Sequence, residues 1–199
     1  PAIGFAAAAW LIFGALADLV ARIRLFRVPL GASLQRLGAL PRGSLGTTIA
    51  HAGLGVTIAG IAGMSLAQQA IVLLHPGQVA HVGGYDWRLE SVGDVAGPNY
   101  AAREARIEVS RDGRVVATLA PQRRSFPVQQ MTTTEARINT NLIRDLYAVL
   151  GEERDGGAVL RLHVNWLAPW IWLGALIMAA GGLVSLADRR LRVGAPARR

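Results

Sequence analysis

The stretch GTTIAHAGLGVTIAGIAGMSLA, residues 46–67, runs for 22 residues without a charged side chain. As a helix, at about 1.5 Å per residue, it would reach about 33 Å and cross the hydrocarbon core of a bilayer. Residues 2–20 carry only one charge, Asp18, and residues 166–187 carry none. Near the start of this last stretch stand Trp166, Trp170 and Trp172, as in an interfacial aromatic belt. The sequence therefore predicts three transmembrane helices.

The composition agrees with a membrane protein. Only 17% of the 199 residues are charged and 52% are hydrophobic, whereas about 25% are charged in an ordinary soluble domain. Of the 21 basic residues, all arginine, five lie between Arg22 and Arg42 and five between Arg189 and Arg199. Basic residues beside membrane spans favour the cytoplasmic side. The net charge of +8 is thus assigned to topology, and no nucleic-acid partner is expected.

The segment between the second and third spans has the alternation of β-strands. Tyr85, Trp87 and Leu89 alternate with charged neighbours, and Asp112-Gly113 has the signature of a hairpin turn. About six short strands in some 90 residues indicate a small antiparallel barrel or sandwich. The predicted fold is a membrane protein with three transmembrane α-helices and a small external antiparallel β-domain.

The expected order of segments follows from these boundaries. It is a transmembrane helix over 1–20, a cytoplasmic loop over 21–45, a transmembrane helix over 46–68, a periplasmic β-domain over 69–164, a transmembrane helix over 165–187 and a cytoplasmic basic tail over 188–199. The chain begins at Pro1, directly inside an apolar run, and is expected to be a piece of a longer protein. It has no cysteine, which excludes disulfides, thiol catalysis and covalent haem attachment to the chain itself.

His51 is the main candidate for a functional residue because an ionisable group inside a membrane span is costly. Gly55, Ala59 and Gly63 follow it at intervals of four along one helix face. Two interpretations remain open. Either the small residues pack helices closely and a backbone carbonyl satisfies the imidazole, or the imidazole binds a metal or haem iron beside them.

The remaining candidates are weaker. His75 and His81 are expected to have structural or solvent-exposed roles, since no further ligand completes a zinc site near them. Four residues in two expected loops are candidates for contact with a partner, although the pattern alone favours ordinary turns. They are Asn99, Tyr100, Met131 and Glu135.

Several motifs stand in order along the chain: Thr48 to Gly53, Gly97 to Tyr100, Gln129 to Glu135, Asp145 to Gly151, Trp170 to Gly174 and the ending Asp188-Arg189-Arg190. Together they resemble the C-terminal part of the CcmF family of cytochrome c-type biogenesis proteins. The resemblance covers about Arg42 to Arg192. The chain departs from the family where Asn165-Trp166 replaces a frequent Asn-Pro.

The resemblance implies a multi-pass haem lyase of the bacterial inner membrane. This family transfers haem from a haem chaperone to the CxxCH cysteines of apocytochrome c, and the expected partners also include thiol-handling maturation subunits. It further implies a non-covalent haem b between two membrane histidines, of which only His51 is present, so the second axial ligand lies outside this chain. The tryptophan-rich segment and external histidines that hold the transferred haem are absent, so no residue here is expected to be catalytic and the fragment alone is not a lyase.

Two other functions remain open from the sequence. A b-type cytochrome subunit for electron transfer would explain His51 but leaves the external domain without a role. A membrane-anchored periplasmic interaction module without a cofactor is the interpretation if His51 only packs.

Overall fold

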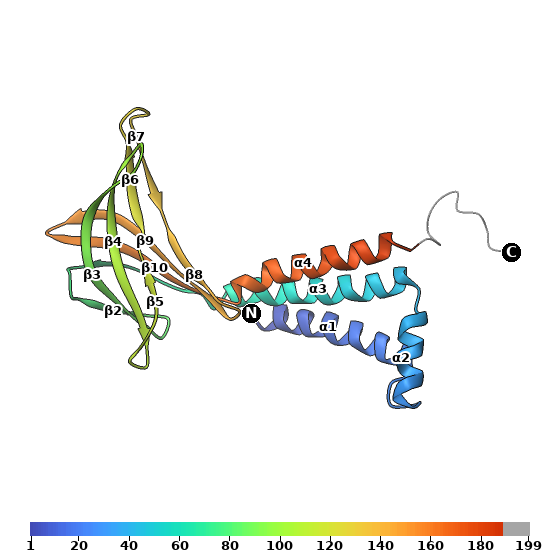
Figure 1. Cartoon of the computed structure of the whole chain (residues 1–199). Helices are drawn as coiled ribbons and strands as arrows, with labels where there is room; N and C mark the ends of the chain where they lie inside the picture. The colour runs from blue at the N-terminus through green and yellow to red at the C-terminus, as the bar shows by residue number, and fades with distance from the viewer. Residues whose placement is uncertain (189–199) are drawn as a thin grey trace. The chain divides into compact units, whose positions relative to one another are not determined.

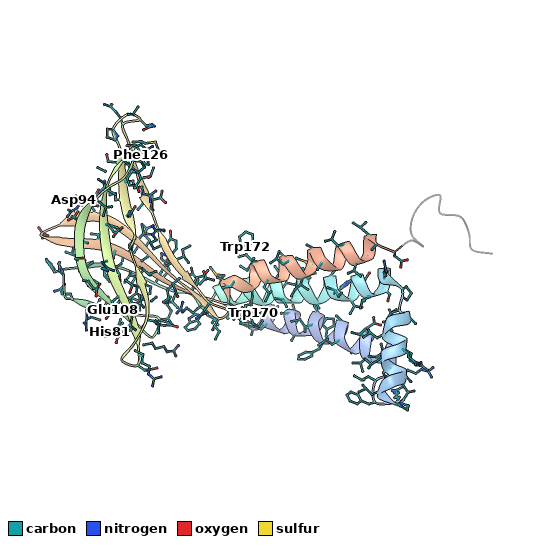
Figure 2. All side chains as sticks on the ribbon, viewed as in Figure 1. His81, Asp94, Glu108, Phe126, Trp170 and Trp172 are labelled. Carbon is teal, nitrogen blue, oxygen red and sulfur yellow. The ribbon has the colours of Figure 1, made fainter. Side chains whose placement is uncertain are left out.

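Four helices form the first of two compact units in the computed structural model, which describes residues 1–188. They are α1 (Ala2–Ile23), α2 (Leu30–Ala39), α3 (Arg42–Met64) and α4 (Ala168–Leu186) (Figure 1). α1, α3 and α4 are long and apolar enough to cross a membrane, as the sequence predicts. Trp172 projects from α4 away from the other helices (Figure 2) and is 75% exposed, as expected of a side chain that faces lipid.

Glycines on α3 allow its neighbours to approach at backbone distance. A Cβ atom added to Gly53 would lie 2.8 Å from the carbonyl oxygen of Gly174 on α4. One added to Gly60 would lie 2.7 Å from the amide nitrogen of Ile171. On the α1 side, a Cβ atom at Gly55 would lie 3.0 Å from the carbonyl oxygen of Ala8. Such contacts are typical of membrane helices, whose association relies on close packing.

Several boundaries differ from those expected. The predicted cytoplasmic loop contains α2, a ten-residue helix. α3 ends at Met64 rather than at residue 68, because the Ser65 hydroxyl donates to the carbonyl oxygen of Ala62 and Gln68 already belongs to a strand. Trp166 also belongs to a strand and not to the third span. The predicted basic tail, beyond Asp188, lies outside the described residues.

The second unit, residues 66–166, is an antiparallel β-sandwich. It contains ten strands among the described residues, more than the six or so expected. They are β1 (Gln68–Leu74), β2 (Val79–Val82), β3 (Tyr85–Ala96), β4 (Ala101–Arg111), β5 (Arg114–Leu119), β6 (Gln122–Phe126), β7 (Met131–Glu135), β8 (Arg137–Thr140), β9 (Arg144–Arg154) and β10 (Gly157–Trp166). One sheet has the order β1-β10-β9-β8, and the other has β2-β3-β4-β6-β7 with β5 also paired to β4.

The alternating residues of the sequence form the core of this sandwich. Trp87, Leu89, Ile107 and Leu160 are fully buried between the two sheets. Asp112 and Gly113 both have positive φ, 52° and 74°, in the turn between β4 and β5, which is the geometry that Asp-Gly favours in two-residue hairpins. The interpretation of these patterns as half-buried strands is confirmed.

The packing of α3 against α4 predicts different effects for two glycines of one helix. Gly174→Val should destabilise the protein by about 1–3 kcal/mol, because the added atoms overlap the backbone of α3. Gly182→Val is the matched control, since a Cβ atom there meets nothing within 4 Å. Thermal unfolding of the detergent-solubilised protein measures both, and equal midpoints for the two variants would contradict the packing.

Candidate functional site

His51 lines a groove between α1 and α3. The groove has a volume of about 530 Å³. Its walls consist of Trp10, Leu11, Gly14, Ala15, Asp18 and Arg22 from α1 and of Ser44, Thr47, Thr48 and His51 from α3. The His51 side chain is exposed rather than packed against another helix of the unit. Gly55, one turn further along α3, packs against α1 at Ala8 and Ile12, so the small residues and the imidazole have different surroundings.

The hydrogen bond of His51 determines which ring nitrogen is available. Nδ1 lies 2.8 Å from the carbonyl oxygen of Thr47, one helical turn earlier. A carbonyl oxygen only accepts, so Nδ1 carries the proton and Nε2 has a free lone pair. Within residues 1–188, Nε2 has no hydrogen-bond partner. A neutral imidazole whose second nitrogen is fixed by a carbonyl is the usual form of a histidine that binds a metal.

One end of the same groove is polar. The Asp18 carboxylate accepts a hydrogen bond of 2.7 Å from Nε of Arg22 within α1. Nη1 of Arg22 donates to the Ser44 hydroxyl across to α3, at 2.8 Å. Asp18 and Arg22 are therefore paired with each other, which is the normal condition for ionised groups close to lipid.

Of the other histidines, all in the β-sandwich, His75 and His81 have hydrogen-bond partners, whereas the buried Nε2 of His163 has none among the described residues. Nε2 of His75 lies 3.0 Å from the carbonyl oxygen of Asp155. His81 is 79% exposed and its Nδ1 lies 2.5 Å from the Asp86 carboxylate. Burial, with a smaller contribution from Arg161, lowers the pKa of His163 on β10 below its usual value. The contacts of His75 and His81 thus hold a turn and a strand pair together.

Three of the four loop residues proposed for partner contact lie on one face of the β6–β7 end of the sandwich. The Arg124 guanidinium stacks 4.5 Å above the centre of the Tyr100 ring and pairs with Glu135 at 3.7 Å. Met131 belongs to the same face, through its pairing with Phe126 on β6. Asn99 is exposed in the turn before β4. The structure thus brings Tyr100, Met131 and Glu135 together around Arg124, a residue that sequence reasoning did not select.

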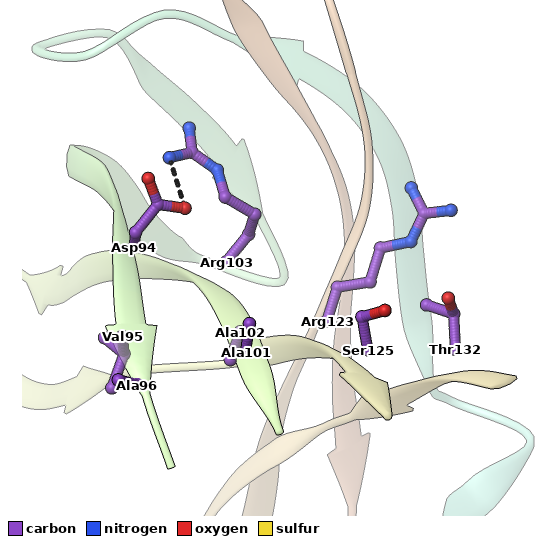
Figure 3. A pocket seen from close by; sticks show the side chains of 9 residues that line it. All are labelled: Asp94, Val95, Ala96, Ala101, Ala102, Arg103, Arg123, Ser125 and Thr132. Carbon is purple, nitrogen blue, oxygen red and sulfur yellow. Dashed lines mark ion pairs between the residues drawn. The ribbon is translucent and has the colours of Figure 1, made fainter. Parts of the chain in front are cut away.

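The opposite face of these strands carries an ion-pair cluster that sequence reasoning missed. Arg103 donates from Nε and Nη2 to the two carboxylate oxygens of Glu153, at 2.7 and 2.6 Å. Its Nη1 forms an ion pair with Asp94 at 3.1 Å, which Figure 3 shows. The bond from Arg103 lowers the pKa of Glu153, although burial opposes it. The 50 residues that separate Glu153 from Arg103 in the chain explain why the sequence did not reveal this pair.

Arg144 is a second group that the sequence did not reveal. It is only 4% exposed. Its Nη1 donates to both oxygens of Asn139, and its Nε donates to the Tyr85 hydroxyl at 3.2 Å. Because all these partners lie in the β-sandwich, Arg144 stabilises the end of the domain and is not a free cation.

Comparison with known proteins places the chain in a family. Residues 65–166 match the family described as "CcmF C-terminal beta-sandwich". The chain belongs to this family of cytochrome c biogenesis proteins, the haem lyase family, as its motifs indicate. The bacterial relatives and the three spanning helices make it a bacterial inner-membrane protein.

Individual relatives cover nearly all of the chain. It is 44% identical over 197 residues to "Cytochrome c-type biogenesis protein CycK" of Rhizobium meliloti, covering 98% of this chain and 29% of the relative. It is 37% identical over 191 residues to "Cytochrome c-type biogenesis protein CcmF" of Pseudomonas aeruginosa, covering 95% and 28%. The solved structure of "Cytochrome c Heme Lyase CcmF" shares the fold, with a TM-score of 0.65, 23% identity and coverage of 92% and 30%. The chain thus spans less than a third of these relatives.

Proposed function

We propose that the chain is the C-terminal part of a cytochrome c haem lyase and that Nε2 of His51 is one axial ligand of a non-covalent haem b. The observation that carries the proposal is the Nδ1 contact of His51 with Thr47, because it leaves the nitrogen that binds iron unprotonated and fixes the ring. The exposed groove beside it supplies room for a flat macrocycle.

The walls of the groove suit such a group. Trp10 and Leu11 present apolar surface, and Gly14 opposes no side chain, since nothing lies within 4 Å of an added Cβ atom. A haem b bound there would supply a one-electron redox centre. The residues of this chain would hold the iron through His51 and cover part of one side of the ring, and the second axial ligand would come from the remainder of the longer protein.

We assign the covalent chemistry to the longer protein with its partners. The haem lyase would receive haem from a haem chaperone and pass it to the CxxCH thiols of apocytochrome c, assisted by thiol-handling subunits. This chain has no cysteine and so supplies no thiol for the thioether bonds. The β-sandwich would serve these partners as a contact surface around Tyr100, Met131 and Glu135, with Asn99 beside it.

Haem content tests the role of His51. His51→Ala in the full-length protein should remove most of the b-type signal in the reduced-minus-oxidised absorbance spectrum, because the iron loses a ligand. His81→Ala should leave the spectrum unchanged, since this exposed side chain of the β-sandwich pairs with Asp86. A His51→Ala protein with normal haem content would return His51 to a packing role and favour an interaction module.

Membrane orientation is a second expected outcome. Because five arginines lie between the first two spans, we propose that this loop and the C-terminus are cytoplasmic and the β-sandwich periplasmic. Alkaline phosphatase inserted near Gly156, in the β9–β10 turn, should be active, and green fluorescent protein fused after Arg199 should fluoresce. The reverse pattern would refute the orientation.

The partner surface predicts a maturation defect without loss of haem b. Tyr100→Ala combined with Glu135→Ala should reduce the yield of holocytochrome c by about tenfold, as for loss of an aromatic anchor at an interface. Protein level and haem b should stay normal. Arg114→Ala, on the exposed β4–β5 hairpin, is the control. Loss of the double-variant protein would show a structural role, and normal maturation would refute the surface.

A further inference from the structure

Two consecutive arginines of β6 point to opposite faces of one sheet. Arg124 lies on the outer face, where Nε donates to Gln122 at 2.9 Å, Glu135 pairs with it and Tyr100 stacks against it. Arg123 lies on the inner face, directly opposite Arg103 in the register of β4 and β6. The alternation of a β-strand thus gives one arginine a full set of partners and places the other beside a like charge.

The other sheet covers only part of the inner face of β4 and β6. Ala101, Arg103 and Ala105 alternate along β4 on this face. Ala105 is fully buried in the sandwich core, whereas Ala101 and Ser125 are exposed. The same sheet surface therefore continues from the core into an open groove of about 420 Å³ (Figure 3). The groove is lined by Asp94, Val95, Ala96, Ala101, Ala102, Arg103, Arg123, Ser125 and Thr132.

The two arginines of this groove share two carboxylates unequally. Arg103 is held by both oxygens of Glu153 and by Asp94. Arg123 makes no hydrogen bond or ion pair within residues 1–188, and its effect on the pKa of Glu153 is the smallest of those that act on that group. Like charges directly opposite each other on a sheet are unfavourable. A half-buried guanidinium that no acid of residues 1–188 hydrogen-bonds, beside a like charge, therefore favours binding of an external anion.

We infer that this groove binds the carboxylate of an aspartate or glutamate in an extended segment of a partner protein. The planar guanidinium of Arg123 matches a carboxylate with two parallel hydrogen bonds. The hydroxyls of Ser125 and Thr132 line the same side of the groove (Figure 3). The alanines at 96 and 101 leave space for a peptide backbone, and β7 is the last strand of its sheet, an edge to which an extended segment adds by main-chain pairing. The inference is independent of haem binding at His51.

A defined set of peptides tests the inference. Eight-residue peptides that alternate threonine and valine, with one glutamate placed at each position in turn, are compared with the same peptides carrying glutamine. Fluorescence anisotropy with the detergent-solubilised full-length protein measures binding. The best glutamate peptide should bind about tenfold more tightly than its glutamine counterpart, as expected for a charge-assisted bidentate pair. Arg123→Gln should abolish this difference, and Arg114→Gln should preserve it.

Charge reversal separates recognition from a folding defect. Arg123→Glu should select the lysine version of the best peptide over the glutamate version, which an unfolded domain would not do. Equal binding of glutamate and glutamine peptides to the unaltered protein, no binding of any peptide, or a glutamate preference that survives Arg123→Gln would overturn the inference. Binding of zinc protoporphyrin IX that requires Arg123, without peptide binding, would overturn it in favour of a propionate.

Discussion

The close contact of α3 with α4 is the interaction on which the rest of the structure depends. In lipid, apolar side chains gain little from meeting each other, so helices associate where small residues let backbones touch. Gly53 and Gly60 provide such contacts along α3. Near Gly60 and Ile171 the end of α3 lies beside the start of α4, and in the sandwich the first strand pairs with the last, Gln68 opposite Val164. In each unit the two points at which the chain passes to the other unit therefore lie close together. Short linkers can then join the units, with the β-domain inserted in the sequence between α3 and α4.

Polar chemistry divides between the two units according to their solvent. In the helical unit a polar group without a partner is costly, and the backbone contact of His51 with Thr47 satisfies one ring nitrogen and leaves the other free. In the β-sandwich, arginines and acids form exposed or half-buried pairs such as Arg103 with Glu153. We propose on these grounds that a cofactor belongs to the helices and protein contacts belong to the strands.

The parts of the fold that follow a local rule could be predicted from the sequence. Three apolar stretches, the alternation at Trp87 and Leu89, and the turn at Asp112-Gly113 depend on neighbouring residues alone. Side-chain hydrogen bonds between residues far apart in the sequence could not be predicted. Arg103 and Glu153 are 50 residues apart, and the buried Arg144 donates to the hydroxyl of Tyr85, which belongs to a distant strand. The helix α2 was missed because arginine-rich segments beside a span look like loops. The sequence singles out His51 because an ionisable side chain is costly in lipid. Which of its ring nitrogens is free depends on the contact with Thr47, which only the structure shows.

Because Arg123 and Arg124 lie on opposite faces of the sheet, β6 tolerates few changes in length. A substitution in β6 alters one side of the sheet, but deletion or insertion of a single codon before Arg123 would exchange the two faces for every residue up to the hairpin, since the side-chain period is two. The paired arginine would then enter the groove, and the unpaired one would turn to the outer face. Evolution of the hairpin should therefore proceed by replacement within β6, with length variation confined to the Pro127–Gln130 turn.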